Sequence, residues 1–434
     1  MRRLSVRTQA LLLVTLLVGT GVAVTVAQNA APPPSAAQRP AARAESLEAR
    51  AARIHREAII LDTHIDTIRS IERPGWKFTD RHDVADSNVD LPRMKEGGLT
   101  GAFFAIDGND QMKGPAVVED TLRQFDVLRS LAAEMPDKVM LCFTANDVRR
   151  AKAAGKVAML IAIEGGHMVN DSLATLRAYA QLGARYMTLI HFVSTSWAYS
   201  VPGGALAPGP ASQHDGLTAF GKQVVREMNR LGLIVDISHA SDKTFYDALE
   251  TSRAPIFASH SSSRALANLA RNMTDDMIKA LAAKGGIVQI NFQASFLDDA
   301  YLEAQQKLQP EVAALRQELE VKYPGRENAG KRTNEVRAFQ TARLPKVSWT
   351  RIVDHIDHVV KLVGADHVGL GSDFAGMPMP EGMEDVSHLP RITEELLRRG
   401  YREADVKKIL GGNTLRLFEQ VEAVSKKLRA QATH

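Results

Sequence analysis

Cysteine is nearly absent from this sequence of 434 residues, which contains only Cys142. An intrachain disulfide is therefore excluded, and the fold must be stabilised by a hydrophobic core or by bound metal. Cys142 lies in the apolar run VMLCFTA. A buried packing role is a better interpretation than a thiol nucleophile, because free cysteine is among the most buried residue types.

A strong charge of either sign is also lacking. The chain has 54 Lys and Arg residues and 50 Asp and Glu residues, for a formal net charge of +4. Removal of Arg2, Arg3 and Arg7, which precede an apolar stretch, leaves 51 basic and 50 acidic residues. Because the sequence also has no internal repeat and no nucleic-acid-binding motif, we expect no nucleic-acid partner.

The first residues are typical of a secretory signal peptide, which we expect over residues 1–27. The three arginines precede the apolar stretch Ala10–Ala27, and Thr25-Val26-Ala27 offers a cleavage site, with Gln28-Asn29-Ala30 as a second choice. An uncleaved membrane anchor is the alternative, although the stretch is barely long enough to span a bilayer. We expect a periplasmic or secreted protein without a stable membrane anchor; the export route, Sec or twin-arginine, stays open.

A single large domain is expected over residues 53–425. An Ala/Pro-rich linker over residues 28–52 precedes it, and a polar tail over 426–434 follows it, with no hydrophobic segment that could direct a lipid anchor. Within the domain, Leu297–Thr341 is long, polar and charged, and predicts a helical insertion. Its role stays open between a solvated surface excursion, a substrate lid and an oligomer contact.

Eight apolar runs, most of them separated by amphipathic helical patterns, predict strands buried on both faces. Repeated alternation of strand and helix predicts an α/β fold of the (β/α)8 TIM-barrel type, with the insertion after the seventh strand. The predicted strands are Ala58–Asp62, Thr100–Asp107, Val157–Glu164, Tyr186–His191, Leu233–His239, Pro255–His260, Gly286–Phe292 and His367–Asp373. The clearest helical patterns are Val117–Met135, Leu217–Leu231, Thr350–Val363 and Ile392–Arg399.

Six of these runs end on, or lead directly into, residues that bind metals or transfer protons. The carboxyl ends of all strands in such a barrel meet at one rim, where barrel enzymes have their active sites. The sequence therefore predicts one site at that rim. Its members are His64, Asp66, Glu164, His191, His239, His260 and Asp373.

The residue types at this rim suit two metal ions. His64 and Asp66, two positions apart on an extended strand, point to the same face and can bind one ion. His239 and His260 end successive strands and can bind the other, while the two oxygens of Glu164 can bridge both ions. Imidazole nitrogen and carboxylate oxygen are ligands that suit Zn²⁺. The sequence thus predicts two zinc ions per chain.

The expected chemistry is hydrolysis by a hydroxide that bridges the two ions and attacks a carbonyl carbon. Asp373 is predicted to move the proton as general acid and base, and His191 to stabilise the oxyanion. Each residue also has a structural interpretation: a lone histidine at a strand end is usually hydrogen-bonded, and Asp373 in GSDFAG can cap a turn. That all of these residues meet at one rim favours the metal site.

The remaining histidines carry less information. His167, close to Glu164, and His214, after the Gly/Pro-rich stretch Pro202–Ala211, are left undecided, and that stretch itself could line or cap the pocket. The other histidines are interpreted as structural or solvated; they are His55, His82, His355, His358, His388 and His434.

Long stretches of the sequence strongly resemble the renal, or membrane, dipeptidase family of zinc peptidases. The resemblance extends over most of Ile59 to Glu419, in the expected order, and lacks only the insertion. The matching stretches are DTHIDT, DLPRMKEGGLTGAFFA, IEGGH, GLTAFGKQVVREMNRLGLIVDISHAS, SHSSSRA, ARNMTDDMI, DHVGLGSDFAG, PEGMEDVSHLPRITEELLRRG and GGNTLRLFE.

The resemblance implies a barrel with a binuclear zinc site and the same ligand assignment. It also implies that His191 contacts the reacting carbonyl oxygen and that Asp373 is the acid and base. Arg271, in ARNMTDD, would bind the terminal carboxylate of a dipeptide, a role that suits a guanidinium fork. From its own residues alone, the sequence predicts a surface arginine at this position.

Two departures from the family pattern bear on specificity. Family members commonly have a second acid where this chain has Ala375, and often a tyrosine near the substrate where this chain has Phe296. The lipid anchor and the intersubunit disulfides of some animal members cannot carry over, because the tail and the cysteines are missing. Any homodimer is therefore expected to be non-covalent.

The expected function is that of an exported zinc-dependent dipeptidase, which as in relatives could accept a D-residue at the C-terminal position. One alternative keeps the barrel and both metals but hydrolyses another amide, a lactam or an ester. A second alternative is a non-catalytic binding protein on the same scaffold, which the intact set of ligands and Asp373 disfavour. The preferred side chains of the substrate do not follow from the sequence.

Overall fold

The structure, a computed structural model, describes residues 45–201, 216–325, 328–374 and 378–431, all of which belong to one unit, Glu45–His434. The expected signal peptide, the Gly/Pro-rich stretch, His214, Ala375 and His434 lie outside the described residues. None of the described helices is long and apolar enough to cross a membrane.

Eight parallel strands form a closed barrel in the order β1, β2, β4, β5, β6, β7, β8, β9, with β9 returning to β1. A ninth strand, β3, pairs with the first residues of β4 outside this ring. The strands are β1 (Leu61–Ile65), β2 (Gly101–Asp107), β3 (Val139–Leu141), β4 (Val157–Glu164), β5 (Ala184–Thr188), β6 (Ile234–Asp236), β7 (Phe257–Ala258), β8 (Ile287–Ile290) and β9 (Val368–Leu370). The predicted (β/α)8 barrel is confirmed.

Side chains alternate between the barrel interior and the layer beneath the helices, as the two-residue period of a strand requires. On β4, Ala158, Leu160 and Ala162 pack in one buried cluster, and the residues between them pack in another. Glu164 continues the first series and therefore points into the barrel. The interior is filled by aromatic rings, with the ring centroid of Tyr186 5.2 Å from that of Phe103.

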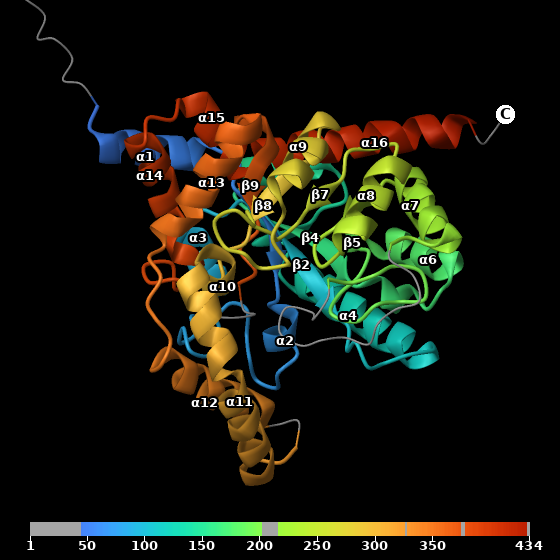
Figure 1. Ribbon diagram of the computed structural model, residues 1–434. Coiled ribbons are helices and arrows are strands. Elements are labelled where there is room, and N and C mark those ends of the chain that lie inside the picture. The colour runs from blue at the N-terminus through green and yellow to red at the C-terminus, as the bar shows by residue number, and fades with distance from the viewer. Residues whose placement is uncertain (1–44, 202–215, 326–327, 375–377, 432–434) are drawn as a thin grey trace, which may run out of the picture. The chain divides into compact units, whose positions relative to one another are not determined.

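Helices surround the barrel on its outer side (Figure 1). The helices are α1 (Leu47–Glu57), α2 (Ile68–Ile71), α3 (Leu91–Glu96), α4 (Pro115–Glu134), α5 (Ala145–Ala153), α6 (Leu173–Leu182), α7 (Ala219–Leu231), α8 (Asp242–Thr251), α9 (Asp275–Ala283), α10 (Ala294–Leu297), α11 (Asp299–Lys322), α12 (Ala329–Thr341), α13 (Thr350–Val363), α14 (Pro390–Arg398), α15 (Glu403–Lys407) and α16 (Asn413–Gln431). All four helical patterns singled out in the sequence correspond to helices, namely α4, α7, α13 and α14.

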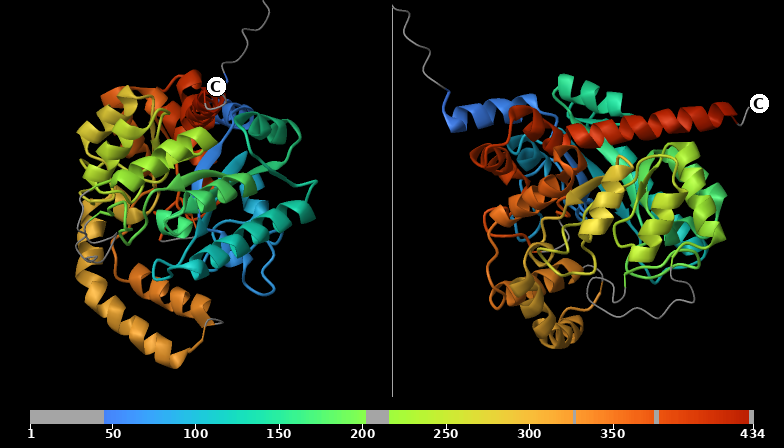
Figure 2. Two further views of the ribbon diagram at one scale, coloured as in Figure 1. Left: turned by 90° about the vertical axis from the view of Figure 1, so that its right-hand side faces the viewer. Right: turned by 45° about the horizontal axis from the view of Figure 1, so that its top comes forward.

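The two ends of the barrel are covered differently (Figures 1 and 2). Helix α16 crosses the amino-terminal end of the strands, where Phe418 packs into the interior cluster with Phe103. At the other end, α11 and α12 lie side by side as a hairpin, which confirms the predicted helical insertion. Because α16 covers the amino-terminal end, it leaves the carboxyl-terminal rim of the barrel uncovered.

Several predicted boundaries were wrong. Four strands end two or three residues before His191, His239, His260 and Asp373. Beyond β6 and β9, the amides of Ser238 and Ser372 bond to carboxylate side chains rather than to a neighbouring strand. The barrel unit is also longer at both ends than expected. Helix α1 begins at Leu47, within the expected linker 28–52, and α16 continues to Gln431, within the expected polar tail.

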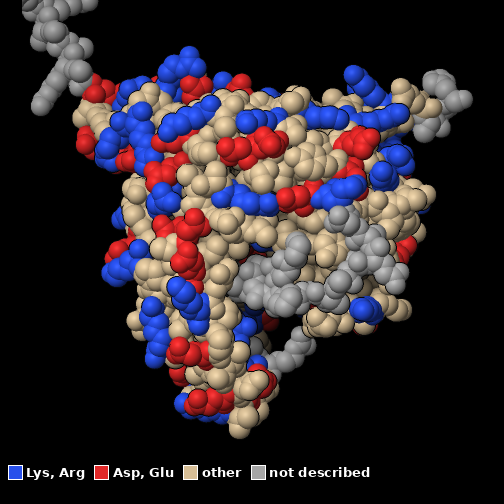
Figure 3. Space-filling view, in the orientation of Figure 1, with Lys and Arg blue, Asp and Glu red and all other residues tan. Residues whose placement is uncertain are grey.

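Charges of both signs are mixed on one face of the molecule. Basic and acidic side chains are interspersed across the face drawn in Figure 3, without a continuous stripe of one sign. Cys142 is buried, in agreement with the packing role, and its burial raises the pKa of the thiol to about 12. A thiol with so high a pKa is a poor nucleophile at neutral pH.

Candidate active site at the carboxyl-terminal rim

The structure brings the predicted site residues together at one rim of the barrel. His64 lies within β1 and Glu164 is the last residue of β4. The loops that follow β1, β5, β6, β7 and β9 supply the others, which are Asp66, His191, His239, His260 and Asp373. All but Asp66 are buried.

Four imidazole nitrogens surround one oxygen of Glu164. The Nε2 atoms of His239, His64 and His260 lie 3.2, 3.4 and 3.4 Å from its Oε1 atom, and that of His191 lies at 3.9 Å. Burial by itself would raise the pKa of Glu164, but His64 and His191 lower it well below its usual range. The carboxylate is therefore ionised at the centre of the cluster.

The strand that carries His64 is irregular at this point. The register between β1 and β2 shifts between Asp62 and Ile65, as in a β-bulge, and a bulge re-aims the side chains that follow it. The His64 ring meets the aromatic core, where its Nδ1 atom lies 2.6 Å from the hydroxyl of Tyr186. Its Nε2 atom lies 3.3 Å from Oδ1 of Asp66. Packing of the barrel interior thus orients this histidine.

A chain of hydrogen bonds holds His260. Its Nδ1 atom lies 2.8 Å from the hydroxyl of Ser259, which donates to Oδ2 of Asp236 at 2.6 Å. With the Nδ1–H of His260 donating to this hydroxyl, its Nε2 atom is free to bind a metal, and such outer partners are typical of metal-binding histidines. Burial lowers the pKa values of His239 and His260 well below normal, so both rings are neutral.

Asp373 receives hydrogen bonds from two amide side chains. Asn291 donates to its Oδ2 atom at 2.9 Å, and Gln293 donates to the same oxygen. The Asp373 amide is bonded to the backbone oxygen of His64 at 3.0 Å, so the loops after β1 and β9 are joined. Burial raises the pKa of Asp373 to about 7, and the negative charge of Asp66 adds to the rise.

An acidic residue that the sequence did not single out holds His191. Oδ2 of Asp110, in the loop after β2, lies 2.9 Å from Nδ1 of His191. Burial would lower the pKa of His191, but the charges of Glu164 and Asp110 raise it. His167, left undecided above, lies at the edge of this pair, with its Nδ1 atom 3.9 Å from Oδ1 of Asp110.

Arg271 is buried, with 4% of its surface exposed, so the prediction of a surface arginine from its own residues was wrong. Its guanidinium lies near the hydroxyl of Ser261 and the backbone oxygen of His260, at 3.4 and 3.5 Å, and 5.3 Å from the ring centre of Phe296. Its Nε atom has no hydrogen-bond partner among the described residues. Burial lowers its pKa to about 10, so it stays charged at neutral pH.

Backbone strain is concentrated at the rim. Among the described residues other than glycine, four have positive φ, and two of them are His239 (φ 68°) and Asp373 (φ 62°). Such conformations cost about 1–3 kcal/mol each and are enriched at functional sites. Gly371 is also required here, because a Cβ atom at this position would lie 1.9 Å from the backbone oxygen of Ser259.

The residues at this rim fit metal ions. Three overlapping groups place ligand atoms within 4.8 Å of one another: His64, Glu164 and His260; Glu164, His191 and His239; and His64, Asp66 and Asp373. The buried Nε2 atom of His64 and Oδ1 atom of Asp66 also lack a hydrogen-bond partner among the described residues. Buried polar atoms without partners are costly, and a cation would satisfy both.

Four supporting residues escaped prediction. Tyr186 and Asn291 looked like ordinary strand residues, while Asp110 and Gln293 lie in segments without a periodic pattern. For Asn291 and Gln293 the only signal was their place at the end of a predicted strand. For Asp110 the sequence held no signal, because its partner His191 is distant along the chain.

Comparison with known proteins identifies the family of this chain. The model of the membrane dipeptidase family, peptidase family M19, matches residues 48–432. The structure of the probable dipeptidase PvdM from Pseudomonas aeruginosa is 28% identical, with a TM-score of 0.73, and the match covers 87% of this chain and 99% of that one. A metallo peptidase from Rhodobacter sphaeroides, solved with a phosphinate mimic of the dipeptide L-Ala-D-Ala, is 27% identical, with a TM-score of 0.68 and coverages of 84% and 99%.

The family match spans nearly all of the described barrel, and its members act on peptide bonds with the help of metal ions. The histidine and carboxylate groups at the rim supply the ligands that such a reaction requires. The chain belongs to the membrane dipeptidase family M19 and is a metal-dependent peptide-bond hydrolase.

Proposed function

We propose that this chain is a dizinc dipeptidase. The observation that carries the proposal is the position of Glu164. Its Oε1 atom lies within 3.4 Å of the Nε2 atoms of His64, His239 and His260. A carboxylate so placed is suited to bridging two ions, and nitrogen and oxygen ligands of this kind favour zinc.

Each ion would have its own pair of ligands besides Glu164. His64 and Asp66, whose Nε2 and Oδ1 atoms lie 3.3 Å apart, would hold the first ion. His239 and His260, whose Nε2 atoms are 3.0 Å apart, would hold the second. When bound, two zinc ions supply a nucleophile derived from water at neutral pH and polarise the carbonyl group.

The side chains around the metals divide the remaining work. Asp373 holds and returns a proton, since its Oδ2 atom is fixed by Asn291 while its position beside Asp66 favours protonation. His191, oriented by Asp110, donates a hydrogen bond to the oxygen of the reacting carbonyl, where negative charge develops. Neither group needs to move far, because both side chains are buried.

Arg271 is proposed to limit the substrate to dipeptides. Its guanidinium is charged and buried, and it lacks a carboxylate partner among the described residues. A buried charge of this kind is costly unless it is paired, so the terminal carboxylate of a dipeptide would complete the site. Acceptance of a C-terminal D-residue is supported by the Rhodobacter relative, which binds a mimic of L-Ala-D-Ala.

Substrate length and end groups test this proposal. Zinc-loaded enzyme would be assayed with L-L, L-D and D-L dipeptides, with the same dipeptides amidated at the C-terminus, and with tripeptides, before and after chelation. We expect hydrolysis of free dipeptides only, abolished by chelation. Arg271→Lys, which keeps the charge but loses the fork, should raise KM for free dipeptides and narrow their advantage over the amides.

Two results would point elsewhere. Zinc-loaded enzyme that cleaves no dipeptide would move the search to other amides, lactams and esters on the same site. Unaltered selectivity for the free carboxylate in the Arg271→Lys variant would remove Arg271 from substrate binding. Arg316→Lys, on the exposed surface of α11, is the matched control for the second test.

The cellular location and the oligomeric state belong to the same proposal. The positively charged and apolar residues 1–27 support export to the periplasm or the medium. Fractionation of cells, with N-terminal sequencing of the mature chain, would test this, and retention of Met1 in a cytoplasmic protein would refute it. A non-covalent homodimer would be seen by light scattering.

A further inference from the structure

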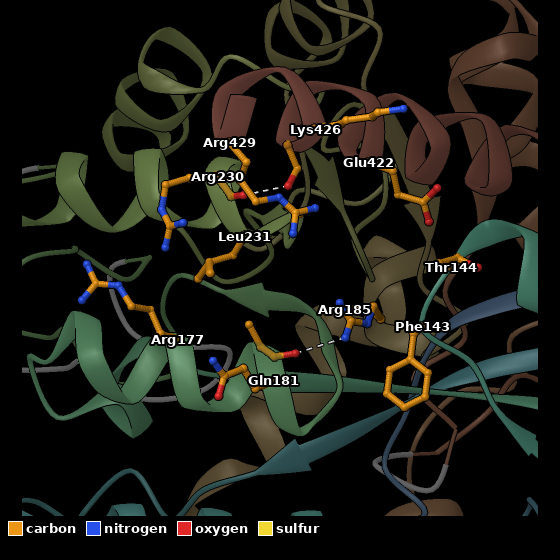
Figure 4. A pocket seen from close by; sticks show the side chains of 13 residues that line it. Phe143, Thr144, Arg177, Gln181, Arg185, Arg230, Leu231, Glu422, Lys426 and Arg429 are labelled. Carbon is orange, nitrogen blue, oxygen red and sulfur yellow. Dashed lines mark hydrogen bonds between the residues drawn. The ribbon is translucent and has the colours of Figure 1, made fainter. Parts of the chain in front are cut away.

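A pocket of about 710 Å³ lies at the opposite end of the barrel from the rim described above. It is bounded by the ends of α6 and α7, the start of β5, and the last turns of α16. Figure 4 shows Arg230 and Arg429 directed into the space between these elements, with Arg185 behind them. Its volume is in the range of about 300–1,000 Å³ that is typical of small-molecule sites.

The lining is strongly basic. Five of the thirteen lining residues are Lys or Arg, and Glu422 is the only acidic one. Arg177 and Arg230 share one carboxylate, that of Glu227, at 2.5 and 2.7 Å. For Arg185, Lys426 and Arg429, no carboxylate of the described residues lies within ion-pair distance. Most of the positive charge is therefore uncompensated.

Arg185 is the most confined of these cations. Its guanidinium donates to the backbone oxygen of Ala180 at 3.1 Å and lies 5.3 Å from the ring centre of Phe143. Its Nε atom is buried without a hydrogen-bond partner among the described residues. Glu422, which also lines the pocket, attracts Arg185 electrostatically but forms no ion pair with it; its Oε1 atom accepts from the Ala145 amide at 2.9 Å. A poorly paired, partly buried guanidinium of this kind lowers the free energy of unfolding unless an anion joins it.

We propose that this pocket is a second binding site, in which Arg185, Arg230 and Arg429 bind the phosphate group of a small organic phosphate. Guanidinium groups bind phosphate oxygens through paired N–H donors. The side chains of Leu231 and Phe143 border the same space and offer apolar contact to the rest of such a ligand. The face drawn in Figure 3 carries both signs of charge, without the continuous basic stripe that a long polyanion requires. A nucleic acid is therefore not the expected ligand.

The pocket is separate from peptide hydrolysis. Arg185 is the second residue of β5, and His191 follows the other end of that strand. Helix α16, whose last turns line the pocket, packs against the amino-terminal ends of the strands. The proposal therefore stands or falls independently of the metal site.

Calorimetric titration with phenyl phosphate, benzoate and inorganic phosphate tests the proposal on zinc-loaded enzyme. A phosphinate dipeptide mimic at saturation would occupy the metal site, so that binding there cannot contribute. We expect phenyl phosphate to bind with one site per chain, more tightly than benzoate, and more weakly as salt is raised. Arg429→Gln, on an exposed turn of α16, should weaken this binding about tenfold or more.

Arg185→Gln should weaken the binding of phenyl phosphate at least as much as Arg429→Gln. Arg316→Gln, a change of an exposed residue on α11, should leave this binding unchanged. Dipeptide hydrolysis by each variant reports that the barrel is folded. Crystals soaked in tungstate, a phosphate mimic, should show anomalous density beside Arg185. The proposal is overturned if phenyl phosphate does not bind, if Arg429→Gln and Arg185→Gln bind it as wild type does, or if tungstate avoids the pocket. Tighter binding of benzoate would reassign the pocket to carboxylates and so overturn the phosphate assignment.

Discussion

Asp373 differs from the other carboxylates of the rim because two amide side chains donate to one of its oxygens. Asn291 and Gln293 fix that oxygen, and the positive φ of Asp373 itself sets the direction of the side chain. A group held in this way transfers a proton to a substrate without first reorienting, which is what general acid and base catalysis requires.

Replacement of Asp373 by Asn should therefore remove turnover but not metal. The isosteric amide keeps the shape of the site but cannot exchange the proton, so kcat should fall by about 10²–10⁴-fold. Metal analysis of the purified variant should give the wild-type zinc content. Loss of zinc from Asp373→Asn would instead make Asp373 a ligand, in line with its place in the group with His64 and Asp66.

Asp110 is expected to affect catalysis only by orienting His191. Its carboxylate lies 2.9 Å from Nδ1 of His191 and is not among the grouped metal-binding atoms. We expect Asp110→Asn to lower kcat by about 10–100-fold, the usual effect of losing an orienting partner, with little change in KM or zinc content. The contrary outcome, a rise in KM with unchanged kcat, would assign Asp110 to substrate binding.

The residues that do chemistry could be foreseen, whereas those that support them could not. Histidine and carboxylate at the ends of apolar runs are unusual enough to stand out, as with His64 and Glu164. Asp110 and Tyr186 are ordinary in their local sequence, and only the closure of the barrel brings them to His191 and His64. Arg271 was foreseen from the family resemblance and not from its own surroundings.

At the level of whole strands and loops, a repeated device holds the rim. Asp62, the second residue of β1, accepts from the amides of His64 and Ser372, and Asp236, at the end of β6, accepts from those of Ser238 and Ser259. Each carboxylate thus ties its own loop to the loop of another strand. Next to the metal-site residues, bonds from backbone amides to carboxylate side chains thus replace part of the hydrogen-bond ladder between strands.

Ser259 tests this device, because it links Asp236 to the ring of His260. We expect Ser259→Ala to weaken zinc affinity by about 10–100-fold, measured by competition with a chelator, while turnover at saturating zinc stays close to wild type. Ser263→Ala is the control, since the Ser263 hydroxyl has no hydrogen-bond partner among the described residues. Equal zinc affinity of both variants and wild type would contradict the supporting role.

Helix α13 fastens two loops through His355. Its Nδ1 atom accepts from the Ser263 amide at 3.1 Å, and its Nε2 atom lies 3.2 Å from the backbone oxygen of Leu297. The Nδ1 atom can accept the hydrogen bond from Ser263 only while the ring is neutral, and burial lowers the pKa of His355 to about 4. In the unfolded chain the same ring takes up a proton near pH 6.5.

Stability should therefore fall as the pH drops from about 6.5 toward 4, because only the unfolded state binds this proton. The shift corresponds to about 3 kcal/mol when complete. Denaturant unfolding of wild type and His355→Gln at several pH values should show a lower free energy of unfolding for the variant at pH 7 and a smaller loss on acidification. Parallel curves would mean that His355 is not the responsible group.

Strand and helix order followed from the hydrophobic pattern, but element ends did not. The helix Thr350–Val363 was predicted to the residue, since its apolar positions repeat over several turns, and the other three helical patterns differ from the observed helices by at most two residues at either end. The three residues of β3 are too few to show a period, and they pair outside the barrel. The predicted strand Leu233–His239 continues past the end of β6, because Ile237 and Ser238 are buried although they do not belong to a strand.

On the scale of the whole barrel unit, the closely packed aromatic core and the candidate active site lie at opposite ends of the barrel. Helix α16 and the aromatic interior close the amino-terminal end, and a hydrogen bond between His64 and Tyr186 connects that core to the metal site. Packing and polar bonds thus hold the ligands without any disulfide, as the single cysteine requires. Bound zinc should add to stability, since the ligands converge only in the folded chain.

The central claim is that peptide hydrolysis depends on two zinc ions held around Glu164. The most direct measurement titrates zinc into chelator-stripped enzyme and follows dipeptide hydrolysis and bound metal per chain together. We predict no activity without metal and a plateau at two equivalents of zinc, with Glu164→Gln binding fewer ions and remaining inactive. Full dipeptide hydrolysis by the stripped enzyme, or by Glu164→Gln, would contradict the account.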